Sequence, residues 1–196
     1  MSERRLTPRG QERRAQLIAV ATTLFATSGY HPTSVADIVD ELGVGKGVFY
    51  WYFESKEELF VEILRTAQKD LRRTQQRQIA ADSDPVKRIA GGVRAAVEWS
   101  AEHRELFQLF EFAHTDEHFA PAIRAGRAVL VQDAATHLVE AMEAGQIPPA
   151  DADRLAHAIL GVTSQLTMEF VLHGTDDPSA VAETVVTFCL GGIGAS

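Results

Sequence analysis

The spacing of apolar residues constrains this chain most, because it is helical in nearly every segment. Apolar residues recur three and four positions apart, which places them on one face of an α-helix. We find no bounded segment that alternates apolar and polar residues as a half-buried strand does. The sequence therefore predicts an all-α fold. Breaks, most of them containing Gly or Pro, separate the helices at residues 29–32, 43–45, 53–55, 80–85, 115–121, 145–151 and 174–178.

One long helix is expected to join a small head to a larger body. Ser55 followed by Glu58 is a capping box, which marks the start of a helix that the apolar stripe carries to about Gln78. We therefore predict an N-terminal domain over residues 1–54 and a helical C-terminal domain over residues 55–196.

The charge of the chain is unevenly distributed. The formal net charge is -8, yet residues 1–77 hold 12 Lys/Arg and 10 Asp/Glu, whereas residues 78–196 hold 7 and 17. Five of the arginines lie in residues 1–14. A basic end joined to an acidic body suits a protein that touches phosphate at one end only.

Two short helices near the N-terminus form the most informative motif. The apolar face of residues 35–42 predicts a first helix, and Gly43 can end it in the left-handed conformation. Residues 46–53 then form a second short helix. Two short helices, a glycine turn and a preceding amphipathic helix indicate a helix-turn-helix, whose second helix lies in the major groove.

The composition of the second helix favours contact with DNA. Gly45 and Gly47 should each destabilise a helix by about 1 kcal/mol relative to alanine, but glycine permits close approach to another backbone. Lys46 can reach a phosphate or a guanine edge. Phe49 and Phe53 are four residues apart, so they can turn inward while Tyr50 and Trp51 turn outward.

The run from Thr33 to Leu59 resembles the DNA-binding domain of TetR-family regulators, because residue types, spacing and the capping box agree together. The resemblance implies phosphate contacts from Thr33, Ser34, Tyr50 and Lys56. It implies groove contacts from Gly45, Lys46, Gly47, Val48 and Trp51. Three of these, Gly45, Val48 and Trp51, depart from the residues common in the family. We therefore expect specificity to depend on thymine methyl groups, DNA shape and the arginine-rich tail.

For the body, the same resemblance implies a homodimer and a cavity for an unidentified small molecule, with no cofactor. The apolar stripes of the last two helices supply the expected dimer interface: Leu155, Ile159, Val162, Leu166, Val185 and Phe188. Aromatic residues with a few polar groups among them supply the expected cavity lining: Leu64, Gln68, Val97, Trp99, Phe107, Phe110, Glu111, His114, Phe119, Arg127 and Met168.

Two other motifs resemble catalytic sequences only in part. His114 and His118 match an inverted zinc-protease string, but such a site needs both histidines on one helix face and a third ligand. The nearby Pro121 indicates a helix end instead, so we expect no metal. The glycines at residues 43–47 lack the Ser or Thr of a phosphate-binding loop.

The sequence thus predicts a DNA-binding regulator and not an enzyme, most simply a repressor that a small molecule releases from a palindromic operator. A cytoplasmic location is expected, because the single cysteine excludes an internal disulfide. The run Leu17–Ala26 is amphipathic and shorter than the ~20 residues of a membrane span, so neither a signal peptide nor a membrane anchor is expected. An activator or ligand-independent regulator, a metallohydrolase and a helical interaction module remain as alternatives.

Overall fold

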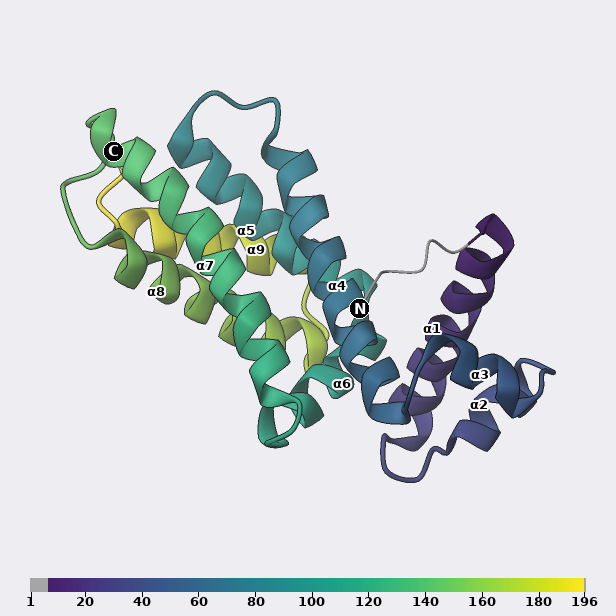
Figure 1. Cartoon of the computed structure of the whole chain (residues 1–196). Helices are drawn as coiled ribbons and strands as arrows, with labels where there is room; N and C mark the ends of the chain where they lie inside the picture. Colours follow the sequence, from purple (N-terminus) through teal and green to yellow (C-terminus); the bar gives the residue numbers. More distant parts are fainter. Residues whose placement is uncertain (1–6, 196) are drawn as a thin grey trace.

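The computed structural model describes residues 7–195, and every regular element in that range is helical, which confirms the predicted all-α class. Figure 1 shows a small head of three helices beside an elongated body. The head comprises α1 (Pro8–Ser28), α2 (Val35–Glu41) and α3 (Lys46–Tyr52). The body comprises α4 (Lys56–Ile79), α5 (Pro85–Glu102), α6 (Arg104–Thr115), α7 (Ala120–Glu143), α8 (Ala152–Leu166), the π-helix η1 (Thr167–Leu172) and α9 (Pro178–Gly192).

The first helix of the head, α1, packs against α2, α4 and α6. Pro8 occupies its first turn and Thr7 accepts a hydrogen bond from the Gly10 amide, which together fix where α1 begins. Its buried face consists of Leu17, Ala21 and Phe25. The segment with the apolar run is therefore an amphipathic helix of the head.

The corner between α2 and α3 forms as its sequence predicts. Ser34 and Asp37 make both hydrogen bonds of a capping box at the start of α2. Gly43 has a φ of 67°, a left-handed conformation that glycine adopts without a steric cost. The Val44 amide then donates to the Val39 carbonyl at 2.9 Å, which closes the turn before α3.

The body is an irregular bundle in which α4 leads away from the head and α5 returns antiparallel to it (Figure 1). Helix α6 lies back beside the head, α7 packs on α8, and α9 packs on α5. The sequence predicted one continuous helix over residues 152–173. In the structure the α-helix ends at Leu166, and the six residues Thr167–Leu172 form the π-helix η1.

Two hydrophobic cores fill the molecule. The far core lies among α5, α7, α8 and α9. The near core joins α1, α2 and α3 to the first half of α4, to α6 and to the start of α7. Tyr30 from the head and Phe60 and Phe112 from the body belong to this one core, so the near core crosses the predicted boundary at residue 54.

Candidate nucleic-acid interface and cavity

The second helix of the motif presents its aromatic residues in two directions. Phe49 and Phe53 are fully buried, whereas Tyr50 and Trp51 are 57% and 62% exposed. The predicted inward and outward orientation is therefore confirmed. Lys46 is also exposed, at the first turn of α3. A helix that leaves two large aromatic side chains in water offers them to something outside the chain.

The two glycines of this helix have no role in the packing of the chain itself. A Cβ atom added at Gly45 or Gly47 would meet no heavy atom within 4 Å, and neither residue needs a positive φ. Both are exposed. The helix thus lacks a side chain where the fold would tolerate one, which fits close approach by a partner's backbone.

Thr33 corrects one predicted contact. Its side chain is buried, and its hydroxyl donates to the Gly29 carbonyl at 2.8 Å. Because the hydroxyl is enclosed by the α1–α2 turn, it cannot reach a phosphate. Ser34 remains exposed, with its Oγ accepting from the Asp37 amide. That capping box also lowers the pKa of Asp37, chiefly through the hydrogen bond from the Ser34 backbone amide.

Lys56, a predicted phosphate ligand, forms hydrogen bonds within the chain. Its ammonium donates to the carbonyls of Tyr30 and Thr33, both at 2.9 Å, and to that of His31 at 3.5 Å. It also lies 4.2 Å from the centre of the Tyr30 ring. An ammonium has three N–H donors, and all three are used within the chain. Lys56 therefore joins the α1–α2 turn to α4, and its phosphate contact stays a prediction.

The arginine-rich tail is described only in part. Arg4 and Arg5 lie outside the described residues. Arg14 pairs with Glu62 at 3.0 Å and lies 5.0 Å from the centre of the Phe53 ring, so it packs against α4 and the end of α3. Arg9 is exposed on the first turn of α1, which leaves it available for contact outside the chain.

An aromatic cluster connects the head to the body. Tyr30 lies 4.8 Å from Phe60, 5.2 Å from Phe112 and 5.1 Å from Phe119, measured between ring centres. Its hydroxyl donates to Glu57 at 3.0 Å, and burial raises the pKa of Tyr30 above its usual value. Phe119 thus belongs to this cluster, which corrects its prediction as a cavity residue.

A cavity of about 790 Å³ opens in the body among α4, α5, α6, α7, α8 and η1. Its size falls within the ~300–1,000 Å³ of small-molecule sites. The predicted lining residues that reach its wall are Gln68, Trp99, Phe107, Phe110, Glu111, His114, Arg127 and Met168. Val97 and Leu64 do not, since each is fully buried in a core. Periodicity shows which residues share a helix face, but α4 and α5 each have apolar residues on more than one face.

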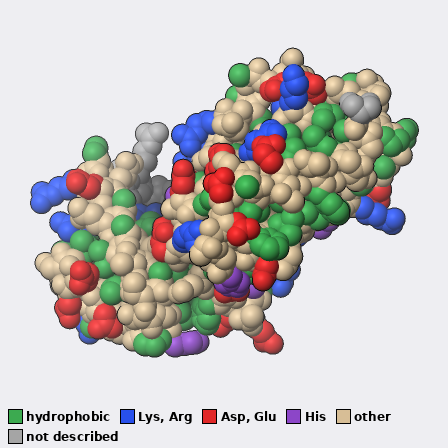
Figure 2. Space-filling view, turned by 180° about the vertical axis from the view of Figure 1, so that it is seen from behind, with side chains coloured by type: hydrophobic (Ala, Val, Ile, Leu, Met, Phe, Trp, Pro, Cys, Tyr) green, Lys and Arg blue, Asp and Glu red, His purple; other side chains and the backbone are tan. Residues whose placement is uncertain are grey.

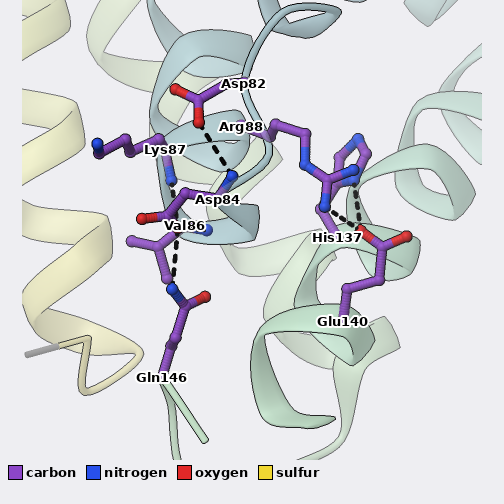
Figure 3. Close-up of polar contacts among 8 residues, drawn as sticks. All are labelled: Asp82, Asp84, Val86, Lys87, Arg88, His137, Glu140 and Gln146. Carbon is purple, nitrogen blue, oxygen red and sulfur yellow. Dashed lines mark hydrogen bonds and ion pairs between the residues drawn. The ribbon is translucent and has the colours of Figure 1, made fainter. Parts of the chain in front are cut away.

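Sequence reasoning missed the polar groups at the end of the cavity far from the head. Arg72 on α4 forms a two-pronged ion pair with Asp133 on α7. Figure 3 shows Arg88 on α5 directed at Glu140 on α7, whose carboxylate also faces His137 at 3.4 Å. These five residues come from three separated segments of the chain, so no local sequence pattern predicts that they pair.

The outer faces of α8 and α9 differ from the predicted dimer interface. Ile159 and Val185 are buried inside the chain, and Ile159 also lies on the cavity wall, so neither is available to a partner. Leu155, Val162 and Leu166 are partly buried against the far core. The large apolar side chains left in water are Phe170 and Phe188, which are 44% and 64% exposed.

The surface of the body is apolar in this region. Seen from behind, hydrophobic side chains gather over the body of the molecule, between scattered charges (Figure 2). The continuous helical segment Ala152–Leu172 is long and apolar enough to cross a membrane, and 22% of its most apolar window is buried. The core helix of a water-soluble protein passes the same test, so the segment alone does not indicate a membrane.

The histidines of the zinc-protease string do not assemble a metal site. His114 lies at the end of α6 and His118 in the turn before α7, and both are exposed. Within residues 7–195, no group of three His, Cys, Asp or Glu side chains could hold a metal ion.

A helix-turn-helix with an exposed second helix, joined to a helical body that contains a cavity, defines a DNA-binding transcriptional regulator. Two family models match the chain: "Bacterial regulatory proteins, tetR family" over residues 17–63, and "Tetracyclin repressor-like, C-terminal domain" over residues 82–193. The chain therefore belongs to the TetR family of bacterial regulators, and members of this family are not enzymes.

Relatives agree with this assignment. The uncharacterized HTH-type transcriptional regulator YdgC of Bacillus subtilis is 26% identical over 194 residues, which is 94% of each chain. The repressor KstR2 of Mycolicibacterium smegmatis is 35% identical over 92 residues, 47% of this chain and 44% of that protein. The fatty acid degradation regulator FadR of Bacillus halodurans has the same fold, with a TM-score of 0.85 at 19% identity, covering 98% of this chain and 100% of that one.

Proposed function

We propose that this chain is a dimeric repressor that binds a palindromic operator and leaves it when a small molecule enters the cavity. One observation carries the proposal. The cavity wall includes α4, and α4 begins at Lys56, directly after the recognition helix ends at Tyr52. A ligand in the body can therefore act on the helix that positions the head.

The route from cavity to head has two parts. Helix α4 contributes Gln68 and Arg72 to the cavity wall and Phe60 to the aromatic cluster. Helix α6 contributes Phe110 to the wall and Phe112 to the same cluster, where Phe112 stacks on Tyr30. A ligand shifts the equilibrium between two arrangements of these helices only by its difference in affinity for them.

Dimerisation is supported by the outer face of α8 and α9. Phe188 on α9 is 64% exposed and Phe170 on η1, the segment that follows α8, is 44% exposed, and exposed large apolar side chains mark interaction surfaces. A second copy with two-fold symmetry would cover the same face on both chains. The two recognition helices would then read half-sites about 34–36 Å apart.

An activator is the second candidate function. The activator FasR of Mycolicibacterium smegmatis is 33% identical over 84 residues, 43% of this chain and 38% of that protein, whereas KstR2 is named a repressor. The sign of regulation depends on where the operator lies relative to the promoter. A reporter gene measured with and without the protein decides between the two.

The cellular setting follows from this function. The protein would work in the cytoplasm, where its DNA is, and would need no cofactor besides the effector. Its partners would be a duplex operator, the small molecule and a second copy of itself.

The decisive test is DNA binding as a function of salt. Duplexes selected from a random pool should contain a palindrome, and the affinity for it should fall steeply as salt rises. Lys46→Ala should reduce the log–log slope by about 1. Lys69→Ala, an equal loss of charge at an exposed position on α4, should leave the slope unchanged. A protein that binds no duplex at low salt would refute the proposal.

A further inference from the structure

The cavity wall holds one arginine that lacks a counter-ion. Three arginines line the cavity. Arg72 is paired with Asp133, and Arg88 with Glu140. Arg127 has no ion-pair partner among the described residues, although it is partly buried. A cation that is partly withdrawn from water is favoured by a nearby negative charge, so the wall has a place for one anionic group.

A second unpaired polar group lines the same cavity. Gln68 on α4 reaches across to α7 at Gly126, where an added Cβ would lie 2.1 Å from the amide carbon of Gln68. Only a glycine at residue 126 leaves room for that amide, and Gly126 directly precedes Arg127. Both Gln68 and Arg127 line the cavity, and neither side chain makes a hydrogen bond within the described structure. Two donors from two helices are thus unused.

The rest of the same end of the cavity is apolar and aromatic. Helix α7 places Ile123, Arg127 and Leu130 on one face, since they are spaced four and three residues apart. Trp99 from α5 and Phe110 from α6 add aromatic rings to the cavity wall. An apolar body would gain hydrophobic free energy here in proportion to the area it buries. Glu111, the one carboxylate of α6 on this wall, is exposed to solvent.

From these observations we infer that the effector is an amphipathic organic acid with one carboxylate. Its carboxylate binds Arg127 and the Gln68 amide, and its apolar chain or ring lies against Trp99 and Phe110. A single unpaired guanidinium matches a single negative charge, and its planar fork suits the two oxygens of a carboxylate. The inference rests on the proposed function, because it names the ligand of that same cavity.

This binding mode would also tie two helices together. Gln68 belongs to α4, which leads to the head, and Arg127 belongs to α7, which lies in the body. An acid that binds both side chains favours the arrangement in which α4 and α7 are held at one separation. The Arg72–Asp133 ion pair already joins these two helices, so the acid would add a second tie between them.

Intrinsic fluorescence can report this binding without DNA. The chain has two tryptophans, of which Trp99 lines the cavity and Trp51 lies on the recognition helix. The full-length Trp51→Phe variant keeps Trp99 as its single tryptophan. It is titrated with straight-chain carboxylic acids from octanoic to octadecanoic acid, and with the neutral alcohol of each length as the control.

At least one acid should change the Trp99 emission with a saturable curve, and the alcohol of the same length should bind about tenfold more weakly or worse. Arg127→Gln should weaken the acid by about the same factor and leave the alcohol unchanged. Arg124→Gln removes the same charge from an exposed position of α7 and should change neither. The acid-against-alcohol comparison needs no cavity variant, so it stands even if Arg127→Gln misfolds.

Three results would overturn the inference. They are equal binding of acid and alcohol, an acid affinity that Arg127→Gln leaves intact, and saturable binding by none of the acids. The proposed function is tested separately with the wild-type chain on its selected duplex. Acid binding by a protein that never binds DNA would refute the regulator and support this ligand. Release from DNA by a neutral compound alone would refute this ligand and support the regulator.

Discussion

The head and the body of this protein differ in how complete each is by itself. In the head, Phe49 and Phe53 are fully buried, and the carbonyls of Tyr30 and Thr33 accept hydrogen bonds from the Lys56 ammonium of α4. In the body, a cavity of about 790 Å³ contains unpaired polar groups, and Phe188 lies in water. The interior of the head is thus filled by its own side chains, whereas the proposed ligand and second copy would fill the cavity and cover Phe188 in the body. Four substitutions test this difference.

The largest effect should come from the aromatic cluster. Phe60→Ala removes a fully buried ring that contacts Tyr30, Phe112 and Phe119, and should lower the free energy of unfolding by about 3–5 kcal/mol. Phe110→Ala trims a ring that already borders empty space and should cost much less. Both values come from denaturant titration. Equal losses at the two positions would mean that the cavity wall is as tightly packed as the cluster.

Lys56→Ala should destabilise the head by about 1–3 kcal/mol, because three carbonyls lose a charged donor. The salt dependence of DNA binding, measured per folded protein, should keep its slope. The matched substitution Lys46→Ala removes an exposed charge and should show the reverse behaviour. A slope that falls by about 1 in Lys56→Ala would instead restore this residue as a phosphate ligand.

Gly47→Ala should separate stability from function in the head. Alanine fits without a contact closer than 4 Å, so the helix should gain about 1 kcal/mol, while DNA affinity should fall because a methyl group now stands on the face toward the duplex. Gly92→Ala on α5 is the control in the body, since its added Cβ meets only the Gln75 amide at 4.0 Å. It should gain similar stability with unchanged DNA affinity. Unchanged affinity in Gly47→Ala would show that the duplex does not approach this backbone.

The smallest effect should be a pH dependence at the start of α2. Hydrogen bonds from Ser34 lower the pKa of Asp37 in the folded chain, so this cap stabilises the head above the unfolded pKa of about 3.9. The stabilisation is lost as pH falls through the folded pKa. Asp37→Asn should therefore lower Tm at neutral pH and lose that difference in acid. Asp40→Asn, exposed on the same helix, should show no such convergence.

The sequence predicted the head better than the body, for a physical reason. The capping box at Ser34, the left-handed Gly43 and the outward Trp51 all follow from residues close together in the chain, where local rules hold. The predicted phosphate contact of the Thr33 hydroxyl was wrong, because this hydroxyl is buried and donates to the Gly29 carbonyl four residues before it. The hydrogen bonds of Lys56 reach carbonyls 23 and 26 residues away, which local rules do not predict.

Errors in the body have a different origin. Ile159 and Val185 lie on apolar stripes of α8 and α9, and both are buried in the core of the chain. An apolar stripe alone does not show whether it faces that core or a second copy of the chain. The pairing of Arg88 with Glu140 joins α5 to α7 across 52 residues. The π-helix begins at Thr167, whose buried hydroxyl has no hydrogen-bond partner. Helix periodicity does not predict this change from an α-helix to a π-helix.

The core shared by Tyr30, Phe60, Phe112 and Phe119 limits how such regulators can be recombined. A head cut at residue 54 would carry Tyr30 into water without the rings that enclose it. A chimera that joins this head to the body of another regulator would therefore need to carry the aromatic cluster with the head. Otherwise the cluster would have to be rebuilt in the other body. A segment that can be exchanged as a unit must therefore include the parts of α4 and α6 that pack on the helix-turn-helix.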